Sequence, residues 1–461
     1  AASQAASNAE SGAERNAVTQ RFCIETYGCQ MNLADSELIG GLLTERGWEA
    51  VSEAGEADVI IVNTCSVRER AAERVIGHVR SMDPLRRRRP HLQIVLAGCL
   101  PQHRGRALAD LLPEVDLFIG PDNYRDLPEL LEAGDAPRRF ALKPNRTETY
   151  ADLSPRRDGR VNAWVSIMRG CNRMCTYCAV PFARGRERSL PAPRVRAEVA
   201  EAVAAGYAAV TLLGQTVTSY RDGDIGLAGL LRSVAEIEGL RRIRFLSPHP
   251  ADFTPELLAV IGEEPKIARH LHLPLQSGST RILEAMRRGY TRDDYLGLVN
   301  EARRLIPGLA VTTDLIVGFP GETTEDYEQT TDLMRQIRFD SAFLFAYSPR
   351  ERTYAQRFLA DDVPDRVKQL RLREIIALQE AHSWERFRAQ VGRRLTVLVE
   401  GPARGEDGRF FGRASDDKAV VITPDPETTA PGPGDKVTVE IIETSSHTLK
   451  GHQLSVARGR E

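Results

Sequence analysis

Three cysteines crowded into one short stretch constrain this chain more than any other feature of its sequence. Cys171, Cys175 and Cys178 follow the spacing Cys-x3-Cys-x2-Cys and define what we call the cysteine loop. That spacing lets three thiolates converge on one metal centre, and soft thiolates favour zinc or an iron–sulfur cluster. A closed zinc site needs a fourth ligand, but no fourth cysteine is near and the closest following histidine is His249. We therefore favour a four-iron cluster with one iron open for a ligand, with a reduced thiol cluster or a three-cysteine zinc site as alternatives.

Composition describes an ordinary globular protein of about three domains. The 461 residues are 42% hydrophobic and 27% charged, with 62 Lys and Arg against 64 Asp and Glu. Overall charge therefore gives no argument for a nucleic-acid partner. We expect no membrane span, and we expect a disordered tail over residues 1–20, because that segment lacks the apolar core of a signal peptide. Seven cysteines without such a signal predict a reducing, cytoplasmic location.

Strand and helix patterns alternate from residue 21 onward. Expected strands occupy residues 22–26, 57–63, 92–97 and 115–119, and expected helices occupy 33–46, 67–80 and 102–112. This α/β alternation predicts a doubly wound parallel sheet. The segment that follows is rich in Pro, Gly, Asp and Arg without an apolar period, and we expect it to be a linker between domains.

One cysteine follows each of the first three expected strands. Cys29, Cys65 and Cys99, which we call the edge cysteines, are about one strand–helix–strand unit apart. Because the carboxyl ends of parallel strands share one edge of a sheet, we expect these thiols to meet in one crevice, as a second three-cysteine cluster would require. The alternative is three unrelated buried cysteines that pack as small hydrophobic residues. Cys23 lies inside the first strand, and we interpret it as a core residue.

A second α/β series begins just before the cysteine loop. Its expected strands occupy residues 162–168, 209–213, 243–246, 270–274, 311–317 and 341–347, and its expected helices occupy 194–205, 227–237, 255–261, 280–287, 293–305 and 324–337. Six such units are too few for a closed eight-stranded barrel, so we predict a partial (βα)6, TIM-like barrel. In barrels of this type, function lies at the carboxyl ends of the strands.

The last part of the chain changes to a period of two. After a long, basic, amphipathic helix expected over residues 363–388, short strands are expected at 395–399, 409–413, 419–422, 437–442 and 449–455. Five such strands predict a small β-barrel, a shape that often binds RNA. Acidic and basic residues balance in this part, whereas residues 156–188 hold eight Arg against two acidic residues. We therefore expect a polyanion to be attracted to the rim of the cysteine loop.

Taken together, the motifs resemble the methylthiotransferase family of radical S-adenosylmethionine (SAM) enzymes. The resemblance rests on Thr-Tyr-Gly-Cys29-Gln-Met-Asn, on Asn-Thr-Cys65-Ser-Val-Arg-Glu, on Ala-Gly-Cys99-Leu, and on the cysteine loop with Tyr177 before its third cysteine. It covers nearly all of the chain after residue 20. It implies an N-terminal methylthiotransferase domain over residues 21–133, a linker over 134–156, a radical SAM core over 157–389 and a TRAM RNA-binding domain over 390–456.

The resemblance implies two 4Fe–4S clusters and SAM as cofactors. A cluster on the cysteine loop would bind and cleave SAM to make a radical, and an auxiliary cluster on the edge cysteines would carry the sulfur that a second SAM methylates. Gly-Cys29-Gln-Met-Asn and Cys65-Ser-Val-Arg-Glu are typical of the branch that adds a methylthio group to carbon 2 of N6-isopentenyladenosine at position 37 of tRNA, beside the anticodon. The alternative substrates in the family are threonylcarbamoyladenosine in tRNA and an aspartate of a ribosomal protein.

Other site residues follow from position in the expected barrel. Tyr177, Gln215, Ser247, Asp314 and Ser348 are expected near SAM or the substrate, with a turn or capping role as the alternative for the polar ones. Two loops depart from the family pattern. Gly-Gln215-Thr-Val-Thr replaces the usual Gly-Gln-Asn-Val-Asn, and Ser348-Pro-Arg-Glu-Arg-Thr replaces Ser-Pro-Arg-Pro-Gly-Thr. The first raises the question of which hydrogen bonds form there, and the second predicts a different loop shape at the barrel mouth.

The implied partners are tRNA, an electron donor of the flavodoxin or ferredoxin type, and a donor of sulfur or of clusters. No feature of the sequence demands more than a monomer, and no membrane partner is expected. Two other classes of protein remain as alternatives. One is a non-enzymatic iron–sulfur or zinc RNA-binding protein, and the other is a radical SAM enzyme whose auxiliary cluster only relays electrons.

Overall fold

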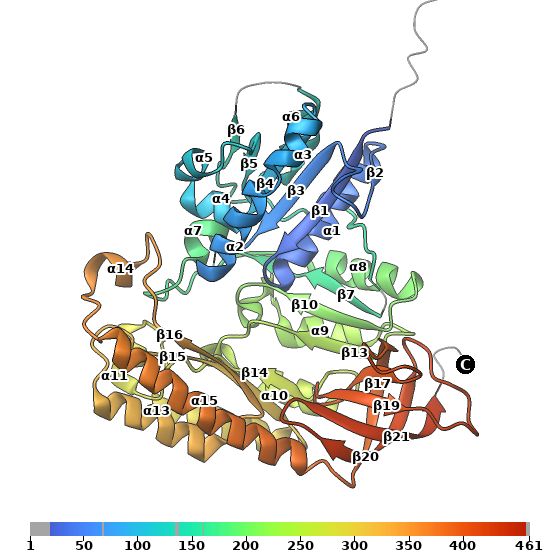
Figure 1. Cartoon of the computed structure of the whole chain (residues 1–461). Coiled ribbons are helices and arrows are strands. Elements are labelled where there is room, and N and C mark those ends of the chain that lie inside the picture. Colours follow the sequence, from blue (N-terminus) through green and yellow to red (C-terminus); the bar gives the residue numbers. More distant parts are fainter. Residues whose placement is uncertain (1–18, 67–68, 134–137, 160, 458–461) are drawn as a thin grey trace, which may run out of the picture.

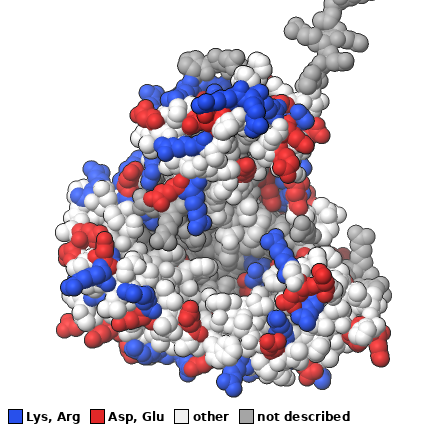
Figure 2. Space-filling model, in the orientation of Figure 1, with Lys and Arg blue, Asp and Glu red and all other residues white. Residues whose placement is uncertain are grey.

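The computed structural model describes residues 19–66, 69–133, 138–159 and 161–457. Most of the tail expected over residues 1–20 therefore lies outside the described residues. The described chain forms three parts in contact with one another: a parallel sheet with helices, a partial barrel and a small closed barrel (Figure 1). Figure 2 shows the same face as hollowed between the N-terminal sheet above and the partial barrel below.

The N-terminal part is a six-stranded parallel sheet in the order β2-β1-β3-β4-β5-β6. Its strands are β1 (Arg21–Tyr27), β2 (Glu49–Ala50), β3 (Val59–Thr64), β4 (Gln93–Gly98), β5 (Leu117–Ile119) and β6 (Arg139–Ala141). Its helices are α1 (Gln30–Glu45), α2 (Glu69–Arg80), α3 (Asp83–Arg88), α4 (Cys99–Arg104), α5 (Ala107–Leu111), η1 (Tyr124–Asp126) and α6 (Leu127–Glu132).

Both faces of this sheet are covered, as the apolar sequence of β3 predicts. Ile60 and Val62 pack on one face with α2, α4 and α5, and Val59 and Ile61 pack on the other with α1 and α6. The prediction of a doubly wound α/β sheet is therefore confirmed. Cys23 is 4% exposed and belongs to the core of the first face, as interpreted from the sequence.

Two local predictions for this part were wrong. The segment 134–156 was expected to be only a linker, but it contributes β6, which pairs with β5 through Phe118 and Phe140. Stacking of these two rings, whose centroids are 5.1 Å apart, gives the short strand a hydrophobic anchor. The single helix expected over residues 102–112 is instead two helices, because the chain turns at Gly105 with φ of 60°.

Six parallel strands form the partial barrel, as predicted. They are β7 (Asn162–Ser166), β10 (Ala209–Leu213), β13 (Arg242–Phe245), β14 (His270–His272), β15 (Ala310–Val317) and β16 (Ser341–Ala346). Two three-stranded sheets, β7-β10-β13 and β14-β15-β16, are joined by a parallel bridge between Ile243 and Ile267. The covering helices are α8 (Ala192–Ala204), α9 (Leu227–Ala235), α10 (Pro255–Glu263), α11 (Thr280–Ala285), α12 (Arg292–Leu305) and α13 (Thr324–Ile337).

Short elements connect these units at the barrel mouth. They are β8 (Met168–Arg169), α7 (Val180–Arg184), β9 (Arg188–Ser189), η2 (Val217–Ser219), β11 (Arg221–Asp222), β12 (Ile225–Gly226), η3 (Pro250–Asp252) and α14 (Tyr354–Phe358). The strand β8 pairs antiparallel with β9, so the cysteine loop and α7 lie between two paired segments. This pairing fixes both ends of the segment that carries the cysteine loop.

The long helix α15 (Asp365–Arg388) runs along the barrel to the C-terminal part. It was expected to be amphipathic, but its buried side is mostly polar. Lys368 bonds Asp361, Arg371 bonds Glu322, and Gln379 donates to the backbone oxygen of Phe339. These charged groups and the amide nitrogen have hydrogen-bond partners, which makes their burial tolerable, whereas Gln379 Oε1 has none among the described residues.

The C-terminal part is the predicted small barrel, closed in the order β17-β18-β19-β21-β20. Its strands are β17 (Arg394–Pro402), β18 (Phe410–Ala414), β19 (Ala419–Thr423), β20 (Lys436–Thr444) and β21 (Thr448–Ala457). It docks on the partial barrel through polar contacts: Arg242 donates to the backbone oxygen of Arg413, and Arg244 pairs with Asp417. No helix among the described residues is long and apolar enough to cross a membrane.

Candidate cluster and substrate site

The structure brings the edge cysteines together at one edge of the N-terminal sheet. Cys29 precedes α1, Cys65 follows β3 directly, and Cys99 begins α4 at the end of β4. A hydrogen bond from Cys65, together with the nearby charge of Arg184, lowers the pKa of Cys29 to about 6. Burial raises the pKa of Cys99, and the charge of Cys29 adds to that rise. The three thiols therefore share one local environment, as expected from their position after neighbouring parallel strands.

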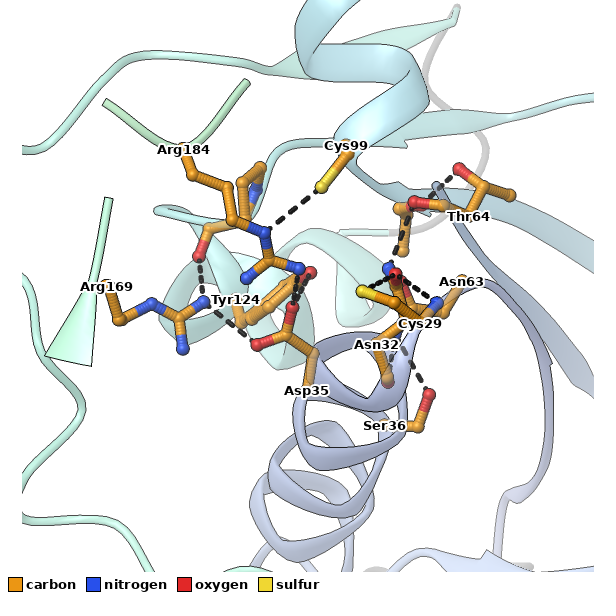
Figure 3. A network of polar contacts seen from close by, with 12 residues as sticks. Cys29, Asn32, Asp35, Ser36, Asn63, Thr64, Cys99, Tyr124, Arg169 and Arg184 are labelled. Atoms are coloured by element: carbon orange, nitrogen blue, oxygen red, sulfur yellow. Dashed lines mark hydrogen bonds and ion pairs between the residues drawn. The ribbon is translucent and has the colours of Figure 1, made fainter. Parts of the chain in front are cut away.

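A pair of asparagines holds two of the cysteine segments against each other (Figure 3). The Asn32 amide donates to Asn63 Oδ1 at 3.1 Å, and the Asn63 amide donates to the backbone oxygen of Asn32 at 2.8 Å. Asn32 Oδ1 in turn accepts from the Cys29 backbone at 3.3 Å. Both asparagines are fully buried, so the pair contributes a satisfied polar network next to the thiols. These two residues belong to the quoted motifs, but we assigned them no role from the sequence.

The third edge cysteine depends on a glycine for its close approach. Gly98 has φ of 96°, and a Cβ there would lie 2.5 Å from Asn63 Oδ1 and 2.6 Å from the backbone oxygen of Thr64. A side chain at this position would therefore push Cys99 away from the asparagine pair. The glycine keeps β3 and β4 close enough for their cysteines to share the crevice.

Two arginines from the partial barrel reach this crevice. Arg169 Nη2 lies 2.9 Å and Arg184 Nη2 lies 2.7 Å from the two carboxylate oxygens of Asp35, a residue of α1. Burial alone would raise the pKa of Asp35, but the two guanidinium groups lower it, so the carboxylate stays charged. Arg184 Nε also lies 3.1 Å from the sulfur of Cys99 (Figure 3). No local pattern in the sequence predicts this contact, because the two residues lie in different domains.

The cysteine loop lies at the mouth of the partial barrel. Cys171 Sγ is 3.2 Å from the hydroxyl oxygen of Thr216, and Arg288 Nη1 is 3.4 Å from Cys175 Sγ. Burial and the neighbouring charge of Cys175 raise the pKa of the Cys178 thiol to about 12. Among the described residues, no three His, Cys, Asp or Glu side chains are placed to hold one metal ion.

The donor chemistry of both thiol sites fits an iron–sulfur cluster. Each site contains three cysteine sulfurs, and each has one buried arginine within hydrogen-bond reach of a sulfur, namely Arg184 beside Cys99 and Arg288 beside Cys175. Hydrogen bonds to ligand sulfurs and nearby positive charge are what a negatively charged cluster requires from a protein.

His249 is a further polar residue at the barrel mouth, and we assigned it no role there from the sequence. Its Nδ1 accepts from the Ala251 backbone at 3.3 Å, but its Nε2 is buried and has no hydrogen-bond partner among the described residues. Burial and the charges of Arg288 and Arg173 lower its pKa to about 2. The ring is therefore neutral and leaves one buried nitrogen at the barrel mouth for a ligand.

The five other expected site residues divide into two groups. Tyr177 stands next to Cys178, with its ring edge against Phe319 and its centroid 6.4 Å away. Gln215 follows β10, and its Oε1 is buried without a hydrogen-bond partner among the described residues. These two lie in the segments that contact the cysteine loop, Gln215 through its neighbour Thr216.

The remaining three have other contacts at or inside the barrel mouth. Asp314 lies within β15 and pairs with His272 at 3.3 Å. Ser247 follows β13 with φ of 60°, and its backbone oxygen accepts from Val217, which supports the turn role that was the alternative. Ser348 follows β16, with Arg350 Nη1 3.5 Å from its hydroxyl.

The two departures from the expected loop patterns have structural consequences. Thr216 supplies the hydroxyl beside Cys171, and the Thr218 hydroxyl accepts from the His249 backbone at 2.8 Å and donates to Asp252. In the second loop, Arg352 adopts φ of 68° and donates to the backbone oxygen of His103 at 3.2 Å. The loop thus bridges the barrel mouth to α4 of the N-terminal part.

The segment 156–188, to whose rim we expected a polyanion to be attracted, has most of its positive charge paired. Six of its eight arginines form ion pairs with acidic residues, and two of these, Arg169 and Arg184, are buried. The six are Arg156, Arg157, Arg169, Arg173, Arg184 and Arg188. The pairs of Arg169, Arg184 and Arg188 join the barrel to the N-terminal part, whereas Arg156 pairs with its near neighbour Asp158.

Comparisons with known proteins agree with this geometry. Residues 21–120 match the uncharacterized protein family UPF0004, residues 165–334 match the radical SAM superfamily, and residues 388–454 match the TRAM domain. The tRNA-2-methylthio-N(6)-dimethylallyladenosine synthase of Chlorobium phaeovibrioides is 45% identical over 93% of this chain and 96% of its own length. The chain belongs to the family of these synthases. The enzyme of the same name from Moorella thermoacetica is 44% identical over 94% of this chain and 98% of its own length.

Solved structures share the fold at low sequence identity. The radical SAM methyltransferase TsrM from Kitasatospora setae, solved with cobalamin and a 4Fe–4S cluster, has a TM-score of 0.54 at 13% identity, over 73% of this chain and 77% of that one. The cobalamin-dependent radical SAM enzyme OxsB has a TM-score of 0.51 at 14% identity, over 77% of this chain and 56% of that one. The fold of this synthase family member is thus that of the radical SAM enzymes.

Proposed function

We propose that this chain adds a methylthio group to carbon 2 of N6-isopentenyladenosine at position 37 of tRNA. The observation that carries the proposal is the pair of three-thiol sites, the edge cysteines and the cysteine loop. Arg184, which follows the cysteine loop in sequence, links them through its contacts with Cys99 and Asp35. A single thiol site would suffice for SAM cleavage alone. The second site gives the inserted sulfur a place of its own, which favours sulfur transfer over a simple electron relay.

The proposed ligands are Cys171, Cys175 and Cys178 for the SAM-binding 4Fe–4S cluster and the edge cysteines for the auxiliary one. When bound, the first cluster supplies the electron that cleaves SAM and the second supplies sulfur. The substrate C–H bond has no acidic proton, so acid–base chemistry by side chains does not suffice. The role of the protein is to position SAM, the sulfur and the adenine next to one another and to exclude water.

Polar groups at the barrel mouth are suited to bind SAM. Gln215 Oε1 is a buried acceptor, and His249 Nε2, which carries the proton of the neutral ring, is a buried donor. Neither has a partner among the described residues, and the ammonium and carboxylate groups of SAM would satisfy them. The carboxylate of Asp314, on β15, pairs with His272. Tyr177 and Phe319 form an apolar wall next to the cysteine loop.

A basic and aromatic surface beside the cysteine loop is suited to bind the tRNA. Tyr354 is 40% and Phe358 is 62% exposed, and Arg287 and Arg357 lie over these two rings at 4.3 and 5.2 Å. The Ala355 backbone donates to the Thr176 backbone at 2.8 Å, so α14 is fixed to the cysteine loop. Exposed rings flanked by guanidinium groups can stack on unpaired bases and contact phosphates. The C-terminal TRAM barrel would add further RNA contacts.

Other partners follow from the chemistry. One-electron cleavage of SAM needs an external reductant, for which a flavodoxin or ferredoxin is suited, and repeated turnover needs a donor of sulfur or of clusters. A tRNA substrate places the reaction in the cytoplasm, and monomeric action remains our expectation.

The test is an anaerobic reaction of the reconstituted protein with SAM, reductant and tRNA carrying isopentenyladenosine, followed by nucleoside analysis by mass spectrometry. We expect the 2-methylthio derivative together with 5′-deoxyadenosine. Deoxyadenosine without that derivative would move the proposal to the alternative substrates, which are tested in parallel with tRNA carrying threonylcarbamoyladenosine and with the ribosomal protein. If protein with both clusters verified forms neither the 2-methylthio derivative nor deoxyadenosine, the proposal is refuted.

A further inference from the structure

A buried charge network joins the edge cysteines to the barrel. Asp35 from α1 pairs with Arg169 from β8 and with Arg184 from α7, and the three side chains are 1%, 3% and 4% exposed. The Tyr124 hydroxyl lies 3.4 Å from the same carboxylate. Figure 3 shows the two guanidinium groups on one side of Asp35, with Arg184 between Asp35 and Cys99.

The charges of this network do not balance. Two guanidinium groups face one carboxylate, which leaves one positive charge in a region closed to water. An unpaired buried charge is strongly unfavourable, so such an arrangement persists where another negative group offsets it. Cys99, whose sulfur lies 3.1 Å from Arg184 Nε, is the group placed to do so when it is a cluster ligand and therefore a thiolate. In addition, Arg184 Nη1 is buried without a hydrogen-bond partner among the described residues, so one of its donors is still available.

Arg169 provides an internal comparison. It pairs with the same carboxylate, donates to the Pro121 backbone oxygen at 3.1 Å and lies over the Tyr150 ring at 4.8 Å. Its contacts with the described residues include no sulfur, although it is buried to a similar extent as Arg184. If the network served only to dock the two domains, the two arginines would be equivalent. The sulfur contact distinguishes them.

We propose that Arg184 is a positioning residue for the auxiliary cluster, which sets the reduction potential of that cluster through a hydrogen bond to Cys99. The inference rests on the proposed role of the edge cysteines as cluster ligands. A hydrogen bond to a ligand sulfur withdraws charge from the cluster and stabilises its more negative, reduced form, which raises the potential. Asp35 holds the guanidinium in place. Because Arg184 follows the cysteine loop in sequence, the segment that carries one thiol site adjusts the reduction potential of the cluster at the other.

The test isolates the auxiliary site in the full-length chain. In a background with Cys171, Cys175 and Cys178 all replaced by Ala, only the edge cysteines remain as a three-thiol site. The protein is reconstituted anaerobically with iron and sulfide, iron content is measured, and the midpoint potential is determined by redox titration followed by electron paramagnetic resonance. Arg184→Lys and Arg169→Lys form a matched pair, because both keep a positive charge beside Asp35 and only the first removes the guanidinium nitrogen from Cys99.

We expect Arg184→Lys to lower the equilibrium constant for one-electron reduction by about tenfold, or about 59 mV. Arg169→Lys should shift the midpoint potential much less, and Arg184→Gln should shift that potential at least as far as Arg184→Lys does. Equal shifts in the two Lys variants, or no shift with a full cluster, would overturn the role of Arg184 and leave the proposed function intact. A background protein that binds no cluster would instead overturn the assignment of the edge cysteines, and this inference with it.

Discussion

The guanidinium of Arg288 lies against the sulfur of Cys175, with 3.4 Å between Nη1 and Sγ. Arg288 is 6% exposed, and it is oriented by the Pro274 backbone oxygen at 2.9 Å and by the Tyr290 hydroxyl at 3.0 Å. The same relationship exists between Arg184 and Cys99 in the other thiol site. Each site thus combines three sulfurs with one buried donor, although the two sites arise from different domains and different sequence motifs.

Cys175→Ala tests the cysteine loop. Removal of one of three thiolates leaves the proposed cluster poorly held, so SAM cleavage should fall to the background rate. The measurement is deoxyadenosine production under dithionite, with iron content as a check. The matched control is Cys23→Ala, since Cys23 is a core residue of the sheet and should leave cleavage unchanged. Retained cleavage in Cys175→Ala would contradict the assignment.

Cys65→Ala tests the edge cysteines separately. Because Cys65 belongs to the other thiol site, the variant should still cleave SAM and should form no methylthio product. Mass spectrometry measures both steps in one reaction: deoxyadenosine reports SAM cleavage, and the digested tRNA reports sulfur insertion. A normal yield of the methylthio nucleoside would show that Cys65 has no part in sulfur insertion.

Gly98→Ala should damage the edge-cysteine crevice. A methyl group there meets Asn63 Oδ1 at 2.5 Å and imposes strain at φ of 96°, so we expect a loss of about 2–3 kcal/mol of stability and reduced iron in the auxiliary site. Thermal unfolding and iron content measure both effects. Gly77→Ala is the control, because its Cβ would meet nothing within 4 Å and the residue lies in helix α2. Equal melting temperatures for the two variants would exclude the proposed clash.

His249 should make stability depend on pH in a defined direction. Its pKa of about 2 in the folded protein lies below the unfolded value of about 6.5, so the unfolded chain binds the extra proton between these values. Stability from this residue is complete above pH 6.5 and falls as the pH is lowered, by about 2 kcal/mol between pH 7 and 5. His249→Gln should lose that part of the pH dependence in thermal unfolding. An unchanged slope would show that the ring is protonated or exposed.

Phe358→Ala and Arg357→Gln test the surface on α14. Loss of one stacking ring should weaken tRNA binding by about tenfold, since a stacked base contributes roughly 1–3 kcal/mol. Loss of the arginine should also make the plot of log affinity against log salt concentration less steep, by the amount that corresponds to about one lost phosphate contact. Filter binding with unmodified tRNA measures both. Leu370→Ala is the control, as Leu370 is 52% exposed on α15. Equal affinities in all variants would place the RNA elsewhere.

Much of the architecture was predictable because it depends on local periodicity. Alternation of apolar strands and helices predicted the doubly wound sheet and the six-unit barrel, and a period of two predicted the closed C-terminal barrel. The failures have local causes as well. Strand β6 has only three residues and no apolar run, and the polar buried side of α15 became visible only with its partners Asp361 and Glu322.

The candidate site divides in the same way. The sequence by itself determined where the six cysteines lie, because the spacing of the cysteine loop and the position of each edge cysteine after a strand are local properties. Only the tertiary structure decided what surrounds them: Arg184 beside Cys99, Thr216 beside Cys171, and the neutral ring of His249. These contacts join residues far apart in the chain. Their existence depends on how separate elements pack and exclude water, which spacing along a sequence does not specify.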